Sequence, residues 1–309
     1  MVTRVSTAGN YASVLANLMA AQGRQVDAGQ RLSTQKNGVD LKDYAKKAET
    51  LTAMRAVERR LVGYQEQNGQ IAAKLSTQND ALVQVVDAAT AARQAIADAL
   101  ASDRGDTLMQ DLQSQFQNAV EGMNTRYDGK YLLAGGQVDT KPVTATQMSD
   151  LTTGPPISSF FQNDQFKAQA KLDDATTVTT GALADNVGTG LLTAFQGIQA
   201  FHQGGGGPFS GQLTQAQRTF LQGQLATFDT VRAGTVAVAA QNGLVQNRVD
   251  QVKESLVGQH DTLTVMLGDI TDADMAKAAT DLTSAQSAVQ AAAQVILALK
   301  DSSLLNLLR

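Results

Sequence analysis

Residues 61–99 read LVGYQEQNGQIAAKLSTQNDALVQVVDAATAARQAIADA, and their apolar side chains fall on two rows with a spacing of seven. A heptad pattern of this length predicts a long helix that packs against another helix. Asn68 and Gln78 are polar positions within the rows, where they can fix the register of the helices at a cost in stability. The first row contains Leu61, Asn68, Leu75, Leu82, Ala89 and Ile96, and the second contains Tyr64, Ile71, Gln78, Val85, Ala92 and Ala99.

A second heptad pattern lies late in the chain. One row is Val249, Leu256, Leu263 and Ile270, and the other is Val245, Val252, Gln259 and Met266. Because apolar rows occur in the first and the last third, we expect these thirds to pair in an antiparallel helical bundle or coiled coil. The expected core of this bundle contains Leu61, Ile71, Leu75, Leu82, Val85, Val252, Leu256 and Leu263.

Uncharged helical patterns flank both of these regions. No charge occurs between Arg4 and Arg24, or from Leu282 to Leu299. Ala278, Ala285 and Ala292 alternate with larger apolar residues in the second run. Since such a seam alone is only marginally helical in water, we expect it to pack against another helix. The expected interface residues are Tyr11, Leu15, Leu18, Met19, Met275, Leu282, Val289, Ile296 and Leu299.

The uncharged run after Asp281 is also close to the length that spans a membrane, about 20 residues. Gln286, Gln290 and Gln294 are spaced by four and stack along one side of the helix. An unsatisfied amide in hydrocarbon costs several kcal/mol, so we expect no membrane span. No cleavable secretory signal is recognisable either, because Asn10, Ser13 and Asn17 interrupt the first apolar run.

The middle of the chain has a different composition. Prolines at 142, 155 and 156 exclude a continuous helix, and the runs of Val, Thr and Phe between them predict short strands. Asp128-Gly129 predicts the tight turn of a hairpin. Helix is expected again from about Leu191, with a break at residues 204–211. We therefore expect a mainly α protein with three parts: a terminal coiled-coil layer (1–36 with 271–309), a helical rod domain (37–135 with 189–270) and a small β-rich inserted domain (136–188).

Catalysis has little support in this sequence. The chain has no cysteine, and its two histidines, His202 and His260, are far apart, so we expect no metal, cofactor or catalytic site. The net charge is −4, and positive and negative residues are interspersed, so the sequence does not indicate nucleic-acid binding. The aspartates of residues 268–274 predict an acidic helix start rather than a calcium loop. Arg104-Gly105-Asp106, an adhesion tripeptide, is expected to be a turn between helices.

Several motifs together resemble the flagellin superfamily. They are RVSTAGNYASVLANLMAAQGRQ (4–25), RLSTQKNG (31–38), DGKYLLAGG (128–136), GDITDADMAKAATDLTSAQSAVQAA (268–292) and SSLLNLLR (302–309). The motif at 128–136 is more similar to hook-associated proteins of the hook–filament junction than to filament flagellin. The run of aspartates that the family carries after the second motif is reduced here to Lys42-Asp43.

The resemblance implies a structural, extracellular subunit whose paired terminal helices form the inner layer of a tubular assembly. It implies as partners other copies of the chain, flagellin and another hook-associated protein at the two axial faces, and an export chaperone at the C-terminal helix. Export would proceed without a cleaved signal peptide. Filament flagellin is the nearest alternative function, and a secreted adhesin or a helical signalling module are others.

Overall fold

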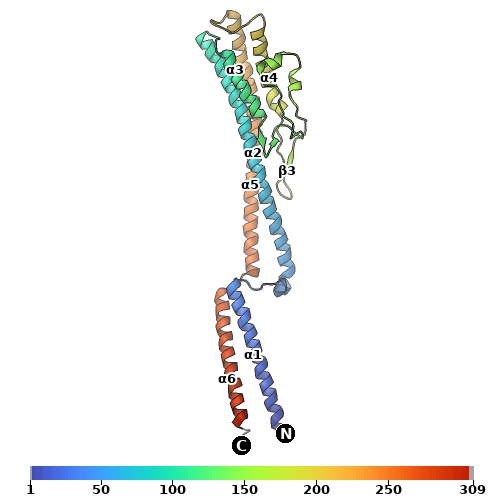
Figure 1. The fold of residues 1–309 in the computed structure, drawn as a ribbon, viewed down its shortest axis with the longest axis vertical. Coiled ribbons are helices and arrows are strands. Elements are labelled where there is room, and N and C mark those ends of the chain that lie inside the picture. Colours follow the sequence, from blue (N-terminus) through green and yellow to red (C-terminus); the bar gives the residue numbers. More distant parts are fainter. Residues whose placement is uncertain (1, 306–309) are drawn as a thin grey trace. The chain divides into compact units, whose positions relative to one another are not determined.

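The protein is mainly α-helical, which confirms the expected fold class. A computed structural model describes residues 2–305, and the side chains of residues 9–299. Contacts divide the chain into a first unit, Met1–Val62 with Gly258–Arg309, and a second unit, Gly63–Val257. The helices, coloured along the sequence in Figure 1, are α1 (Val2–Thr34), α2 (Ala48–Ser102), α3 (Leu108–Met123), α4 (Ala184–Gln203), α5 (Gln215–Thr271) and α6 (Met275–Leu305).

Short strands and 3₁₀ helices occupy the connections between these helices. The strands β1 (Arg126–Tyr127) and β2 (Lys130–Tyr131) form one antiparallel pair, and β3 (Gln169–Lys171) and β4 (Thr177–Thr179) form another. The 3₁₀ helices are η1 (Leu41–Lys47), η2 (Met148–Thr152) and η3 (Ile157–Phe160).

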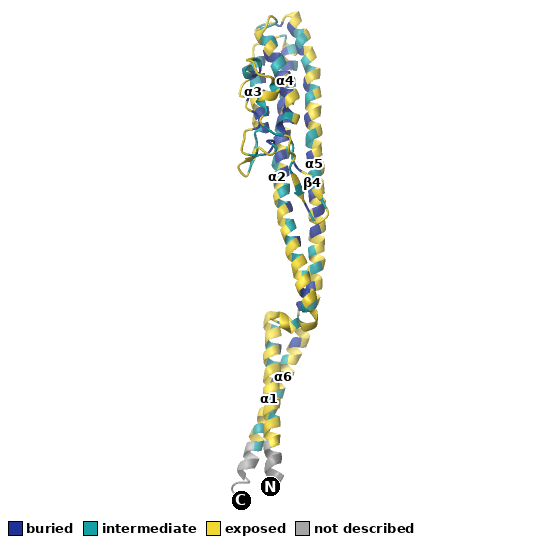
Figure 2. Ribbon diagram, turned by 90° about the vertical axis from the view of Figure 1, so that its right-hand side faces the viewer, coloured by how far each residue is buried: buried dark blue, intermediate teal, exposed yellow. Residues whose placement is uncertain are grey.

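The core of the second unit is built on the heptad rows of α2. Leu75, Leu82 and Ile96 have no exposed surface. Phe116 of α3 packs edge-to-face against Phe195 of α4, which does the same with Phe228 of α5, at centroid distances of 5.5 and 5.3 Å. These three phenylalanines therefore join α3, α4 and α5 in one core. Figure 2 shows the buried interior of this unit.

The predicted second row of α5 is wrong at its C-terminal end. Gln259 is exposed and Met266 is 50% exposed, whereas Leu267 is buried. A straight α-helix drifts by about 20° per heptad relative to a strict seven-residue repeat. By Met266, two heptads after Val252, the row has turned by about 40° from the direction of Val252, and the neighbouring Leu267 is buried in its place.

Residues 136–188 contain little regular strand, and one part of them binds α2. The hairpin of β3 and β4 lies against α2, where Asn68 donates a hydrogen bond from Nδ2 to the Leu172 carbonyl at 2.9 Å. Gln67 donates from Nε2 to the Lys171 carbonyl at 3.1 Å. The polar heptad position Asn68 thus holds the inserted segment.

Two local predictions have different outcomes. The Asp128-Gly129 turn is confirmed, because both residues have positive φ, 51° and 75°, and connect β1 directly to β2. The predicted start of α4 near Leu191 is wrong, because the helix begins at Ala184. Gly188 lies within this helix, where a Cβ atom would come 2.3 Å from Sδ of Met123. Glycine serves close packing there.

Candidate assembly surface

In the first unit, α1 and α6 run antiparallel, side by side (Figure 1). The residues buried most deeply between them are alanines, Ala21 and Ala28 of α1 and Ala278 and Ala285 of α6. Small side chains at these positions allow the two backbones to approach closely. Larger apolar residues line the same seam and are half-buried: Val14, Leu18, Leu32, Leu282, Val289, Ile296 and Leu299.

A second set of apolar residues on this pair points outward. On α1, the exposed fractions are 49% for Tyr11, 41% for Leu15, 58% for Met19 and 66% for Val26. Their spacing of four, four and seven places these four residues, the apolar stripe, on one side of the helix. Figure 2 shows α1 and α6 as largely exposed.

The residues expected at a subunit interface therefore lie in two places. Leu18, Leu282, Val289, Ile296 and Leu299 line the seam within the pair, whereas Tyr11, Leu15, Met19 and Met275 are exposed. The structure adds exposed residues that the sequence analysis missed, Val26, Val295 and Leu297. Val26 could have been found, because it continues the row of Met19 by seven.

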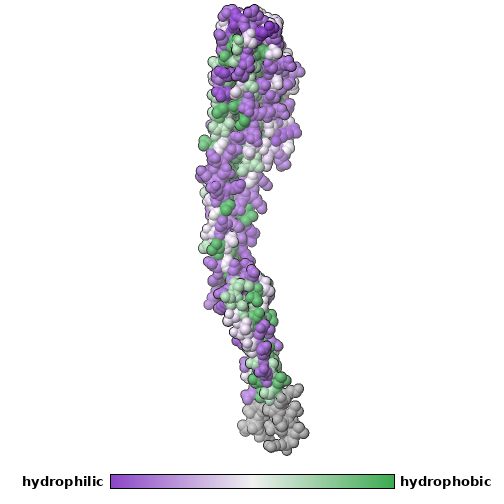
Figure 3. All heavy atoms as spheres, turned by 90° about the vertical axis from the view of Figure 1, so that its left-hand side faces the viewer, coloured by the Kyte–Doolittle hydropathy of each residue, from purple (hydrophilic) through white to green (hydrophobic). Residues whose placement is uncertain are grey.

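Exposed apolar residues of this density indicate a surface that another molecule covers. Figure 3 shows apolar side chains gathered on the part formed by α1 and α6, on the face drawn there. By length and composition Met275–Leu299 could also cross a membrane. In the structure this segment packs along α1 instead, with Gln286, Gln290 and Gln294 exposed.

The segment that follows α1 and the segment that precedes α6 are joined by backbone hydrogen bonds. Asn37 donates from its backbone N to the Thr271 carbonyl at 2.7 Å, and Ala273 donates to the Gln35 carbonyl at 2.9 Å. Between them, Lys36 Nζ lies 2.5 Å from Oδ1 of Asp272. The hydrogen bond from Lys36 is the main cause that lowers the pKa of Asp272. We call this pairing of residues 35–37 with 271–273 the clasp.

Carboxylates stabilise the chain turns on both sides of the clasp. Asp43 accepts hydrogen bonds from the backbone N atoms of Val39 and Asp40, both at 2.9 Å, and these lower its pKa. Asp274 accepts one from the backbone N of Lys277 at 3.0 Å, which caps the first turn of α6. The predicted acidic helix start is therefore confirmed at Asp274.

The expected core residues are buried to different degrees. Leu61, Leu75, Leu82, Val85, Val252 and Leu256 are buried, and Ile71 and Leu263 are half-buried. The tripeptide Arg104-Gly105-Asp106 is a turn between α2 and α3, as predicted. Its two charged residues form an ion pair with each other, with Arg104 Nε 2.9 Å from Asp106 Oδ2.

The remaining polar candidates have structural contacts. His202 accepts a hydrogen bond at Nδ1 from the backbone N of Phe209, at 3.1 Å. Across the described residues, no three His, Cys, Asp or Glu side chains gather as metal ligands would. The surface of the α1–α6 pair is thus the strongest candidate for a functional site.

Part of this chain is similar to a known protein family. Residues 225–308 match the family model described as the bacterial flagellin C-terminal helical region, which confirms the resemblance to the flagellin superfamily over this part of the chain. None of the curated proteins matches.

One of three similar solved structures has a TM-score high enough to show a shared fold, at low sequence identity. A protein of Vibrio parahaemolyticus, described as a flagellar hook-associated protein, is similar with a TM-score of 0.60 and 15% identity, covering 74% of this chain and all of that one. FlgL of Bacillus cereus gives 0.49 and 14% identity, covering 65% of this chain and 98% of that one. FlgL of Xanthomonas campestris gives 0.46 and 12%, covering 72% and 99%.

Proposed function

We propose that this chain is a structural subunit of the bacterial flagellum that joins hook to filament and assembles with copies of itself through α1 and α6. The observation that carries the proposal is the flagellin match over residues 225–308, which contains all of α6. The sequence motif at 128–136 favours the junction over the filament. The fold shared with the hook-associated protein of V. parahaemolyticus is in line with this role.

The α1–α6 pair has the surface that such an assembly requires. The buried residues of its seam are alanines and the larger apolar residues are only half-buried, so two helices alone bury little apolar surface. The apolar stripe of α1 remains exposed in the single chain. Burial of these side chains against neighbouring copies would supply free energy at about 25 cal/mol per Å². Polymerisation therefore stabilises helices that are weakly held in the monomer.

The partners proposed beyond other copies follow from the same role. Flagellin and another hook-associated protein would contact the two axial faces of the assembled ring or tube. An export chaperone would bind α6 before assembly, and the chain would reach the cell exterior without loss of a signal peptide. We assign it no nucleic acid, no membrane span and no catalytic activity.

Filament flagellin is the second candidate, because the family model that residues 225–308 match is described as a region of bacterial flagellin. A deletion strain distinguishes them. If the chain is the junction protein, cells without it build hooks and release flagellin into the medium. If it is the major flagellin, the deletion strain retains the junction and lacks only the filament.

Gold-labelled antibody on isolated flagella gives the direct test. Label confined to a short zone between hook and filament is the expected result. Label along the whole filament would establish the flagellin alternative. Absence of label from flagella, with normal swimming of the deletion strain, would refute a flagellar role.

A further inference from the structure

Over the described side chains of the α1–α6 pair, residues 9–34 and 275–299, charged residues are confined to one short segment of each helix. On α1 no charge occurs at residues 5–23, and on α6 none occurs at residues 282–299. All six charged residues between these stretches and the clasp are exposed. This charged band consists of Arg24, Asp27 and Arg31 on α1 and Asp274, Lys277 and Asp281 on α6.

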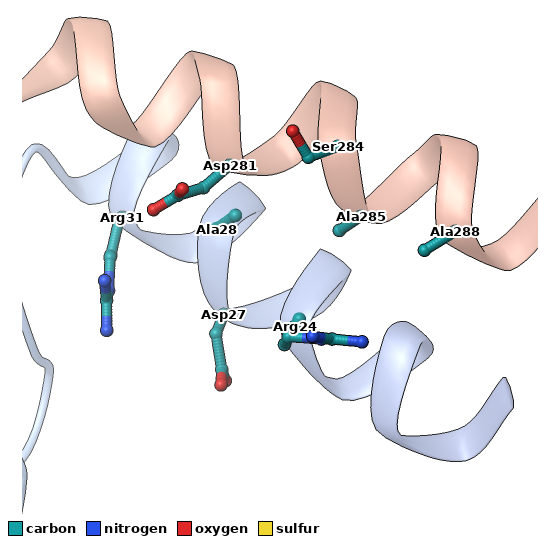
Figure 4. A pocket seen from close by; sticks show the side chains of 8 residues that line it. All are labelled: Arg24, Asp27, Ala28, Arg31, Asp281, Ser284, Ala285 and Ala288. Carbon is teal, nitrogen blue, oxygen red and sulfur yellow. The ribbon is translucent and has the colours of Figure 1, made fainter. Parts of the chain in front are cut away.

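A groove of about 320 Å³ crosses the charged band between the two helices. Small side chains line its middle, among them Ala28, Ala285 and Ala288. Figure 4 shows that Asp27 and Arg31 extend away from α6, while Asp281 extends from α6 towards α1. Among the described ion pairs, none joins two members of the band. Arg31 therefore presents its charge away from α6, whereas Arg24 extends along α1.

The two helices carry opposite net charge in the band. Two arginines and one aspartate leave α1 with one net positive charge, and two aspartates and one lysine leave α6 with one net negative charge. Copies arranged head-to-tail in a ring bring two different surfaces of the same chain together. The α1 side of one copy can then meet the α6 side of the next with complementary charge.

We propose that the charged band sets the register between neighbouring copies, with Arg24 and Arg31 of one copy paired with Asp281 of the next. This inference rests on the proposed function. Apolar packing is non-directional, and a heptad pattern can slide by seven residues without loss of its pattern. The charged band prevents such sliding, because a copy that slips by seven residues places its charged residues against an uncharged part of the neighbouring helix. Complementary charges act mainly on specificity and register.

Charge reversal in two different chains tests the pairing. The α1-reversed variant carries Arg24→Glu and Arg31→Glu, and the α6-reversed variant carries Asp281→Lys, which leaves the Asp274 cap intact. Each variant alone opposes like charges at every contact between copies. Where copies of the two variants alternate, every contact opposes unlike charges, whereas mixing cannot restore a pairing made within one chain.

The variants are expressed in the deletion strain, and swimming cells are counted. We expect each reversed variant alone to lower the count about tenfold or more, because like charges would then oppose each other at each contact between copies. Co-expression should restore it to within about threefold of wild type. Asp80→Lys, an exposed change of the same charge on α2, is the control and should have no effect. Swimming with either reversed variant alone, or no rescue when both are exported, would overturn the proposal.

Cross-linking provides a second measurement that does not depend on reversed charges. The chain lacks cysteine, so Arg31→Cys and Asp281→Cys in two differently tagged copies can form a disulfide only between chains. Oxidised flagella should yield the mixed dimer, and Asp80→Cys paired with Arg31→Cys should not. Absence of the mixed dimer would overturn the pairing. If cells lacking the chain still assemble filaments, the proposed function fails; if they need the chain but reversed variants swim, only the charge pairing fails.

Discussion

Gln78 of α2 donates a hydrogen bond from Nε2 to Oδ1 of Asn242 of α5 at 2.9 Å, and both side chains are buried. Asn242 in turn donates from Nδ2 to the Leu75 carbonyl at 3.0 Å. A slip of α2 along α5 would separate the two amides and leave them without partners, at a cost of about 1–3 kcal/mol each. The pair therefore fixes the axial register of the two helices within the second unit.

The first prediction concerns this pair. Asn242→Leu should destabilise the second unit by about 1–3 kcal/mol, because it leaves the buried Gln78 amide without its partner. The double change with Gln78→Leu should recover most of that loss, since it removes the stranded amide. Urea unfolding of the wild type, both single variants and the double variant gives the coupling energy. Additive effects would show that the amides are independent.

The second prediction compares adjacent residues of α2. Leu82 is fully buried and Val83 is 42% exposed. Leu82→Ala should lower the free energy of unfolding by about 2–5 kcal/mol, because it creates a cavity in the core. Val83→Ala should change it by less than about 1 kcal/mol. Thermal or urea unfolding measures both, and equal effects would contradict the assigned heptad position.

The third prediction concerns the dilute monomer. Trypsin should cut at Arg24, Arg31 and Lys277 before it cuts at Arg93, because the alanine seam of the first unit holds α1 and α6 weakly. Arg93 lies in α2, whose neighbours Ala92 and Ile96 are fully buried. Mass spectrometry of a limited digest identifies the order of cleavage. Simultaneous cleavage at all four sites would place both units at the same stability.

The fourth prediction concerns assembly. Val289→Asp places a charge in the half-buried seam of α6, where removal of a charge from water without a partner is costly. The variant should be exported but should fail to join hook to filament, while the second unit keeps its unfolding midpoint. Gln290→Asp, on the exposed side of the same turn, is the control and should assemble. Flagellin released into the medium is the readout, and normal filaments with Val289→Asp would refute the prediction.

The fifth prediction concerns pH. Because the folded-state pKa of Asp272 is lowered, its contribution to the clasp is complete above the ordinary aspartate value, about 3.9, and is lost as the pH falls through the lowered value. Protection of the Asn37 and Ala273 amides from hydrogen exchange should therefore fall on acidification below about pH 4. In Asp272→Asn the protection should already be low at neutral pH and should vary less. Unchanged protection in acid would show that backbone bonds alone hold the clasp.

Some features follow from local sequence. The heptad rows of α2 identify its buried face because spacing along one helix fixes which side chains share a side. Asp128-Gly129 specifies its turn through the positive φ that both residues adopt. Asp274 caps α6 because a carboxylate can accept a hydrogen bond from an N–H of the first turn.

Other features depend on residues far apart in the sequence, and only the tertiary structure determines them. Lys36 and Asp272 are separated by 236 positions, and no spacing rule connects them. The α1 residues Leu18 and Met19 are adjacent in an apolar pattern, but contact with α6 decides that Leu18 faces the seam and Met19 does not. Periodicity defines the faces of a helix, whereas the partner that covers each face is chosen by packing, which the sequence of one helix does not contain.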